Sequence, residues 1–192
     1  MERPQTPSQT VGPFFQDGLF DRGNENILAD DGVKGQRILV KGQITDGQNQ
    51  PVPDAMIEIW QADGNGYFNH PEDPNHSKAD PHFRGFGRSD TVNNGVFTFK
   101  TIKPGCVPFD SKQMQAPHIN VRVFARGMLI HAYTRLYFSD EAEANQHDPI
   151  LNLVPTERVA TLIALKEEKG DLPTYCFNIA LQGENETVFF NP

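Results

Sequence analysis

Apolar and polar residues alternate along much of the chain with a period of two, which is typical of half-buried β-strands. The clearest case is segment 38–44, where Ile38, Val40 and Ile44 fall on one face and Lys41 and Gln43 on the other. The same alternation predicts strands at 57–59, 96–101, 119–123, 130–138 and 175–181. Turn sequences such as Asp46-Gly47 lie between them. The pattern therefore predicts a protein built mainly of short strands.

Two segments depart from this alternation and predict short helices, at 139–146 and 156–166. In the second, Thr156 is a plausible N-cap, and Val159, Leu162 and Ile163 share one face at helical spacing. We expect a long irregular loop between residues 67 and 88. Together these elements predict an all-β fold, a β-sandwich of mixed or antiparallel short strands with long loops and one or two short helices.

The length of the chain, 192 residues and 21.5 kDa, suits one substantial core. Residues 1–37 are polar and rich in turn formers, and we interpret them as an N-terminal arm lying on a surface. Residues 38–192 then form the predicted sandwich domain. We find no internal repeat and no low-complexity linker that would divide the chain further.

The net charge of -8 and the pI near 5.2 argue against a nucleic-acid partner, because a polyanion would repel this surface. The first ten residues contain no apolar stretch, and no apolar run approaches the roughly 18 residues of a membrane span. We therefore expect no membrane association and a cytoplasmic location. Cys106 and Cys176 are interpreted as a reduced pair of buried thiols without a disulfide.

Segment Pro104–Asn120, PGCVPFDSKQMQAPHIN, is the most informative stretch. It resembles the region of intradiol ring-cleaving dioxygenases that reads PG-x-Y-P followed by A-H-I-H, in which one tyrosine and two histidines hold a ferric ion. Here His118 is present, but Val107 replaces the tyrosine and Asn120 the second histidine. Further similarity lies at 39–44, 55–67, 87–88 and 101–105. The resemblance extends over most of the chain.

Within this family the chain is most similar to a branch in which an alpha chain packs with a homologous beta chain, through Thr6–Thr10, Phe124–Gly127, Thr134–Phe138 and Gln182–Phe190. The resemblance implies a heteromer, expected to form a higher oligomer, that cleaves the small aromatic substrate protocatechuate with O2 to carboxy-cis,cis-muconate. It implies that the cofactor, Fe(III), is bound by two tyrosines and two histidines of the beta chain. We assign no metal ligand to this chain, because neither valine nor asparagine supplies an anionic oxygen or an imidazole.

The resemblance also implies which residues of this chain reach the shared active site. Thr10, Gly12 and Pro13 are expected to bind substrate, and Arg126 is expected to be catalytic. The physical chemistry is reasonable, because glycine lets backbone approach a ligand closely and proline rigidifies that approach. A permanently cationic arginine could stabilise negative charge on the substrate or an intermediate.

Two alternatives stay open at this point. The chain could be a self-sufficient metalloenzyme with rearranged ligands, such as His118 together with His131. It could also be a non-catalytic scaffold or binding sandwich. His70, His76 and His82 recur at six-residue intervals, but their Pro- and Asp-rich surroundings favour a solvated loop. We interpret His118 as a packed, hydrogen-bonded residue rather than a ligand.

Overall fold

A computed structural model of the chain describes residues 6–12, 15, 18–20, 22–167 and 170–191. Its long strands are β1 (Arg37–Thr45), β2 (Met56–Trp60), β3 (Phe86–Asp90), β4 (Val96–Ile102), β7 (His118–Phe124), β8 (Ala132–Phe138) and β9 (Ile163–Glu167). The short strands are β5 (Val107–Pro108), β6 (Met114–Gln115), β10 (Thr174–Cys176) and β11 (Ile179–Ala180). The helix α1 spans Ala142–His147, and 3-10 turns lie at His76–Lys78, Leu151–Leu153 and Val159–Leu162.

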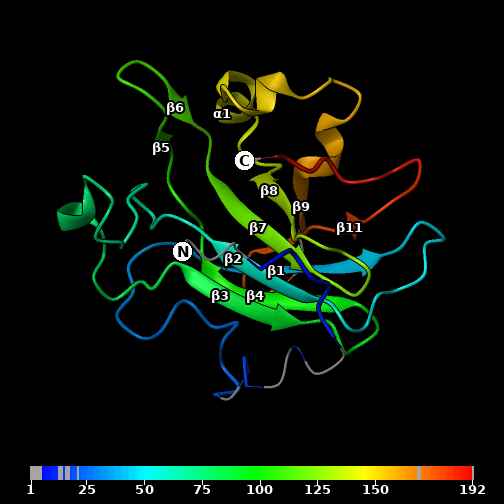
Figure 1. Cartoon of the computed structure of the whole chain (residues 1–192). Helices are drawn as coiled ribbons and strands as arrows, with labels where there is room; N and C mark the ends of the chain where they lie inside the picture. Colours follow the sequence, from blue (N-terminus) through cyan, green and yellow to red (C-terminus); the bar gives the residue numbers. More distant parts are fainter. Residues whose placement is uncertain (1–5, 13–14, 16–17, 21, 168–169, 192) are drawn as a thin grey trace, which may run out of the picture.

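The strands form a mixed sheet in the order β11-β1-β10-β9-β8-β7-β2-β3, with β4 paired to β1. Most neighbours are antiparallel, but β1–β10, β1–β11 and β8–β9 are parallel. In Figure 1 the strands of this sheet gather in the middle of the molecule, while the separate β5–β6 pair and α1 lie on one side of it, beyond β7 and β8. The sheet curls into a nearly closed sandwich, and the predicted fold class is confirmed.

The main core lies between the two halves of this curled sheet. It buries apolar residues of β1 and β4 against those of β2, β7 and β8, among them Ile38, Val40, Phe97, Phe99, Ile57, Val121 and Leu136. Leu28, Ala29 and Val33 also join this core, although they belong to the segment interpreted as an arm. Whether 1–37 acts as a separate arm stays a prediction.

Gly42 of β1 shows how closely two neighbouring backbone segments approach in this sheet. A Cβ on Gly42 would lie 1.7 Å from the carbonyl oxygen of Phe177. No side chain fits into that space, so glycine is required where the backbone between β10 and β11 runs beside β1.

The predicted helix at 156–166 is wrong. The structure has a 3-10 turn at Val159–Leu162 and then β9, in which Ile163 pairs in parallel with Tyr137 of β8. The apolar residues at helical spacing are not the buried face of a helix. Leu162, one of them, is buried in a second hydrophobic cluster outside the main core. Pairing with a distant strand overrode the local helical pattern. The helix expected at 139–146 is confirmed as α1, although it is shorter.

The loop expected between 67 and 88 also ends early, because β3 begins at Phe86 and pairs with β2. The strand expected at 175–181 is divided into β10 and β11. Cys106 is exposed and Cys176 partly exposed, so both are free but neither is buried, in contrast to the expectation. Within the described part of the chain, no helix is long and apolar enough to cross a bilayer. The expected cytoplasmic location stays a prediction.

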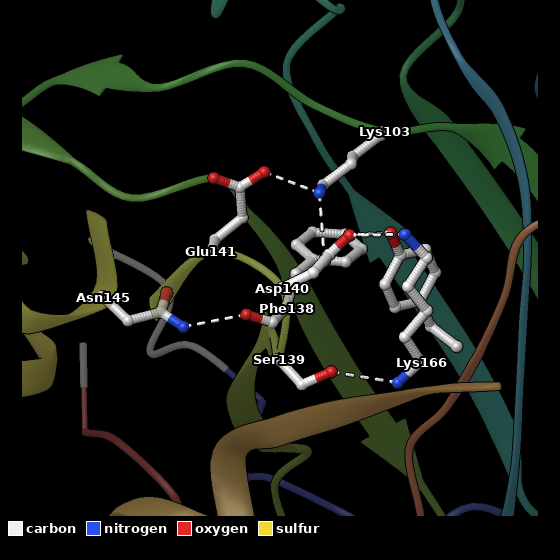
Figure 2. A network of polar contacts seen from close by, with 8 residues as sticks. Lys103, Phe138, Ser139, Asp140, Glu141, Asn145 and Lys166 are labelled. Carbon is white, nitrogen blue, oxygen red and sulfur yellow. Dashed lines mark hydrogen bonds and ion pairs between the residues drawn. The ribbon is translucent and has the colours of Figure 1, made fainter. Parts of the chain in front are cut away.

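A polar network fastens the segment after β8 to the sheet (Figure 2). Lys103 pairs with Asp140 at 3.0 Å and Glu141 at 2.5 Å, and its ammonium lies 5.4 Å from the Phe138 ring centroid. Lys166 pairs with Asp140 at 2.9 Å. Burial alone would raise the pKa of Asp140, but hydrogen bonds from two lysines and a tyrosine lower it to about 2. We interpret this network as structural support for the start of α1.

Candidate functional site

The structure brings two of the predicted site residues together. The side-chain hydroxyl of Thr10 accepts a hydrogen bond of 2.9 Å from the backbone N–H of Gly127, the residue after Arg126. Gly127 adopts a φ of +81°, a left-handed conformation that favours glycine and turns the chain between β7 and β8. Phe15 packs near Phe124 at 5.8 Å between ring centroids. The N-terminal segment is therefore fixed against the β7–β8 turn.

Arg126 projects from this turn with 67% of its side chain exposed. Its Nε forms an ion pair with the Asp54 carboxylate. Gly12 is exposed, and a Cβ placed on it would meet nothing within 4 Å. We call Thr10, Gly12, Arg126 and Gly127 the arm site. Pro13, the remaining predicted residue, lies outside the described residues, so its role stays a prediction.

An apolar hollow of about 360 Å³ adjoins the arm site. It lies between Val11 and Phe15 of the N-terminal segment and the β7–β8 turn. Leu129 and Ile130 of that turn line it and are 65% and 69% exposed. Two large apolar side chains so exposed and so close together are typical of a surface that contacts another chain.

His118, the histidine that the resemblance singled out, is 3% exposed at the start of β7. Its Nδ1 lies 2.8 Å from the carbonyl oxygen of Ala116, which can only accept, so Nδ1 carries the proton. Burial lowers the pKa of His118 to about 4, and the nearby Arg135 cation adds to this effect. The imidazole is packed and hydrogen-bonded, as the sequence led us to expect, and it is neutral near pH 7.

The groups around His118 also bond to one another. Asp148 is fully buried, and its carboxylate accepts hydrogen bonds from the N–H groups of Ala116, Ile150 and Leu151 at 2.7 to 2.9 Å. The Tyr137 hydroxyl donates to the same carboxylate at 3.2 Å. Burial, together with the negative charge of Asp148, raises the pKa of Tyr137 well above its usual value. This tyrosine therefore stays protonated.

These residues do not fit a ferric ion. Asn120 accepts a 2.6 Å hydrogen bond from the Tyr133 hydroxyl, and Val107 is an apolar, buried residue of β5. Fe(III) needs anionic oxygen and imidazole donors. The positions of the family's ligands offer one imidazole, and the nearby Asp148 carboxylate is already occupied by four hydrogen bonds. Over the described ranges there is no group of three or more His, Cys, Asp or Glu side chains placed to hold a metal ion.

The alternative ligand pair of His118 and His131 is contradicted by the strand register. His118 pairs with Tyr137 at one end of the β7–β8 ladder, and Val123 pairs with Ala132, next to His131, at the other. Five residues of strand separate the two ends, about 17 Å. No ion bridges that distance. His70, His76 and His82 are all exposed, as predicted; His70 and His82 lie in loops, and His76 begins a short 3-10 turn.

A hollow that the sequence reasoning missed lies on the outer face of β3, β2, β7 and β8. It encloses about 410 Å³ and is lined by Glu58, Trp60, Phe86, Asn120, Arg122 and Tyr133. We call it the outer hollow. The alternation of Glu58 and Trp60 with Ile57 and Ile59 indicated that these polar and aromatic residues share a face. Their convergence with Arg122 depends on the order of the strands.

A family model described as dioxygenase matches residues 10–183. The protocatechuate 3,4-dioxygenase alpha chain of Burkholderia cepacia is 44% identical, over 97% of this chain and 97% of that chain. The beta chain of the same name and organism is 31% identical, over 96% of this chain and 78% of the beta chain.

Among solved structures, the intradiol ring-cleavage dioxygenase from Tetranychus urticae is similar with a TM-score of 0.62. The comparison covers 95% of this chain and 98% of that chain at 22% identity, so it supports the fold alone. The match of the family model along most of the chain, together with the closely related alpha chain, identifies the family. The chain belongs to the intradiol dioxygenases.

Proposed function

We propose that this chain is the alpha subunit of a heteromeric protocatechuate 3,4-dioxygenase, which opens the aromatic ring of protocatechuate with O2. The observation that carries this proposal is the 44% identity to such an alpha chain along 97% of both sequences. A function assigned from the fold alone would have weaker support, because one fold can host many functions. Here the similarity runs through the whole polypeptide at high identity.

The partner in this proposal is a homologous beta chain that binds the ferric ion. Its support is the donor set of this chain: Val107 and Asn120 stand where a tyrosine and a histidine would be needed, and Asn120 is already bonded to Tyr133. The ion supplies the chemistry that makes a bound catecholate react with oxygen. This chain would then shape and charge the pocket around the substrate.

The arm site is the part of this chain that we propose to reach the substrate. The Thr10–Gly127 hydrogen bond fixes the N-terminal segment beside Arg126, whose exposed guanidinium is free to contact a bound anion along the face not held by Asp54. Gly12 leaves room for close approach of another molecule. The adjoining apolar hollow with Leu129 and Ile130 supports contact between this arm and the partner chain.

The test is to purify the chain alone and together with its partner, and to measure iron content, visible absorption and oxygen uptake with protocatechuate. We expect no bound iron and no uptake for the chain alone, and iron, tyrosinate-type colour and uptake for the complex. Stoichiometric iron on the isolated chain would contradict the proposal. A complex whose activity ignores changes at both Thr10 and Arg126 would instead favour the scaffold alternative.

A further inference from the structure

The outer hollow is built on two rows of side chains that run across four strands. In the first row Arg88, Glu58, Arg122 and Tyr133 are direct cross-strand partners on β3, β2, β7 and β8. In the second row Phe86, Trp60, Asn120 and Arg135 occupy the same strands. Direct partners on one face lie about 5 Å apart, so these rows form a continuous floor.

The floor carries two guanidiniums without a carboxylate partner among the described residues, those of Arg122 and Arg135. The guanidinium of Arg135 is occupied by hydrogen bonds to Gln115 and Tyr133. Arg88 Nε binds Glu58 Oε1 at 2.7 Å, and the Glu58 side chain is 12% exposed, so these two opposite charges neutralise each other. Arg122 lies on the other side of Glu58, lines the hollow, and has no hydrogen-bond or ion-pair partner among the residues that the structure describes. An anion entering the hollow would therefore meet an available guanidinium.

The aromatic residues of the hollow are held in fixed positions. Trp60 stacks on Phe68 with ring centroids 5.6 Å apart and an interplanar angle of 14°, and His70 contacts its edge at 6.0 Å. The Tyr133 hydroxyl is held by Asn120 at 2.6 Å, which leaves its ring as an apolar surface. Rigid aromatic rings offer a flat surface for another ring at little cost in side-chain entropy.

We propose that the outer hollow binds a small aromatic carboxylate, with its ring against Trp60 and Phe86 and its carboxylate on Arg122. A volume of about 410 Å³ accommodates a single-ring molecule. The guanidinium fork matches a carboxylate in geometry and charge. This binding goes beyond the proposed dioxygenase function and does not depend on it, because every contact comes from this chain and none involves iron.

Trp60 provides the measurement, because it is the one tryptophan in the sequence. The full chain labelled with 5-fluorotryptophan should give a single fluorine resonance, which we expect to shift saturably on titration with benzoate. Benzamide, which has the same shape without the charge, should bind about tenfold more weakly or not at all. Equal binding of both compounds, or no saturable shift with benzoate, would overturn the proposal, and this test needs no variant protein.

The variants then locate the carboxylate. Arg122→Gln should weaken benzoate binding by about tenfold, because one charge-assisted contact is lost. Lys112→Gln, which removes an exposed cation lining a different surface hollow, is the matched control and should leave the titration unchanged. If Arg122→Gln and Lys112→Gln behave alike, Arg122 is not the carboxylate ligand and the proposal fails.

The same titration on labelled chain assembled with unlabelled partner extends the test to the complex. A benzoate-dependent shift of the Trp60 resonance, lost in Arg122→Gln, is expected there as well. Disappearance of the shift on assembly would overturn the proposal for the complete enzyme. Oxygen uptake with protocatechuate, measured on the same samples, reports the proposed dioxygenase function separately, so the two failures are distinguishable.

Discussion

The hydroxyl of Thr10 and the backbone N–H of Gly127 lie 2.9 Å apart, although 117 positions separate the two residues along the chain. This single hydrogen bond connects the N-terminal segment to the turn that carries Arg126. It gives the arm site a defined geometry before any substrate or partner is present. Loss of this hydrogen bond should therefore lower the activity of the enzyme more than the free energy of unfolding, because both groups are exposed and can bond to water instead.

Thr10→Val removes the hydrogen bond while keeping the shape of the side chain. We expect kcat/KM of the assembled enzyme for protocatechuate to fall about fivefold, the equivalent of a net hydrogen bond of about 1 kcal/mol. Thr10→Ser keeps a hydroxyl and should stay near wild type. Thr156→Val, at another exposed threonine, is the control. Equal activity of the valine and serine variants at position 10 would contradict this role.

Gly12→Ala tests whether another molecule approaches the arm. The added methyl group would meet nothing within 4 Å in this chain, so we expect its melting temperature to stay unchanged. If the arm contacts substrate or partner in the complex, the same methyl group should lower kcat/KM or weaken assembly. A variant with both wild-type assembly and wild-type activity would show that Gly12 faces open solvent in the enzyme too.

Arg126→Gln should reduce turnover of the complex by a factor on the order of 10 to 100, because a positive charge that stabilises developing negative charge is lost. Iron content and visible colour of the partner should stay intact. Asp54→Asn is the companion variant, because it removes the ion-pair partner of Arg126 and leaves the guanidinium in place. Unchanged turnover in Arg126→Gln would remove this residue from the site.

His118 should make the fold sensitive to acid. Its pKa is about 4 in the folded chain and 6.5 without burial, so below pH 6.5 the unfolded chain binds a proton that the folded chain does not. The free energy of unfolding should therefore fall as the pH drops from 6.5 to 4, with a loss of about 3 kcal/mol below that range. Stability at pH 7 and above is unaffected by this group.

The measurement is chemical denaturation across that pH range, compared with His118→Asn. The asparagine amide can donate to Ala116 as His118 Nδ1 does, but it does not titrate. We expect the variant to lose this part of the pH dependence while the contribution of the carboxylates remains. Identical pH profiles for the two proteins would contradict the buried, neutral imidazole.

Asp148→Asn should destabilise the chain by about 2 to 4 kcal/mol in thermal or chemical unfolding. The buried carboxylate accepts from three backbone N–H groups and from Tyr137, whereas an amide would direct its own N–H group at one of these donors. Asp110→Asn is the control, because Asp110 likewise accepts hydrogen bonds from backbone N–H groups, two in its case, but is exposed. Equal losses for the two variants would argue against the importance of burial.

The sequence by itself determined the strands whose apolar residues alternate. Segments 38–44, 96–101 and 119–123 all became strands, because period-two alternation allows burial of one face against the core. It also determined the missing metal ligands, since Val107 and Asn120 lack suitable donor atoms in any fold. The arm residues Thr10, Gly12, Pro13 and Arg126 were found through resemblance rather than through any local pattern.

The tertiary structure decided what depends on contacts between distant residues. Segment 156–166 has helical spacing but ends as β9, because its pairing with Tyr137 and Phe138 outweighs local preference. Residues 86–90 form β3 since β2 lies beside them. The arm site and the outer hollow likewise arise from strand order and register, which place Thr10 at Gly127 and Arg122 at Glu58. A local pattern specifies which face of a strand is apolar, but contacts in the folded chain decide which strands lie beside it.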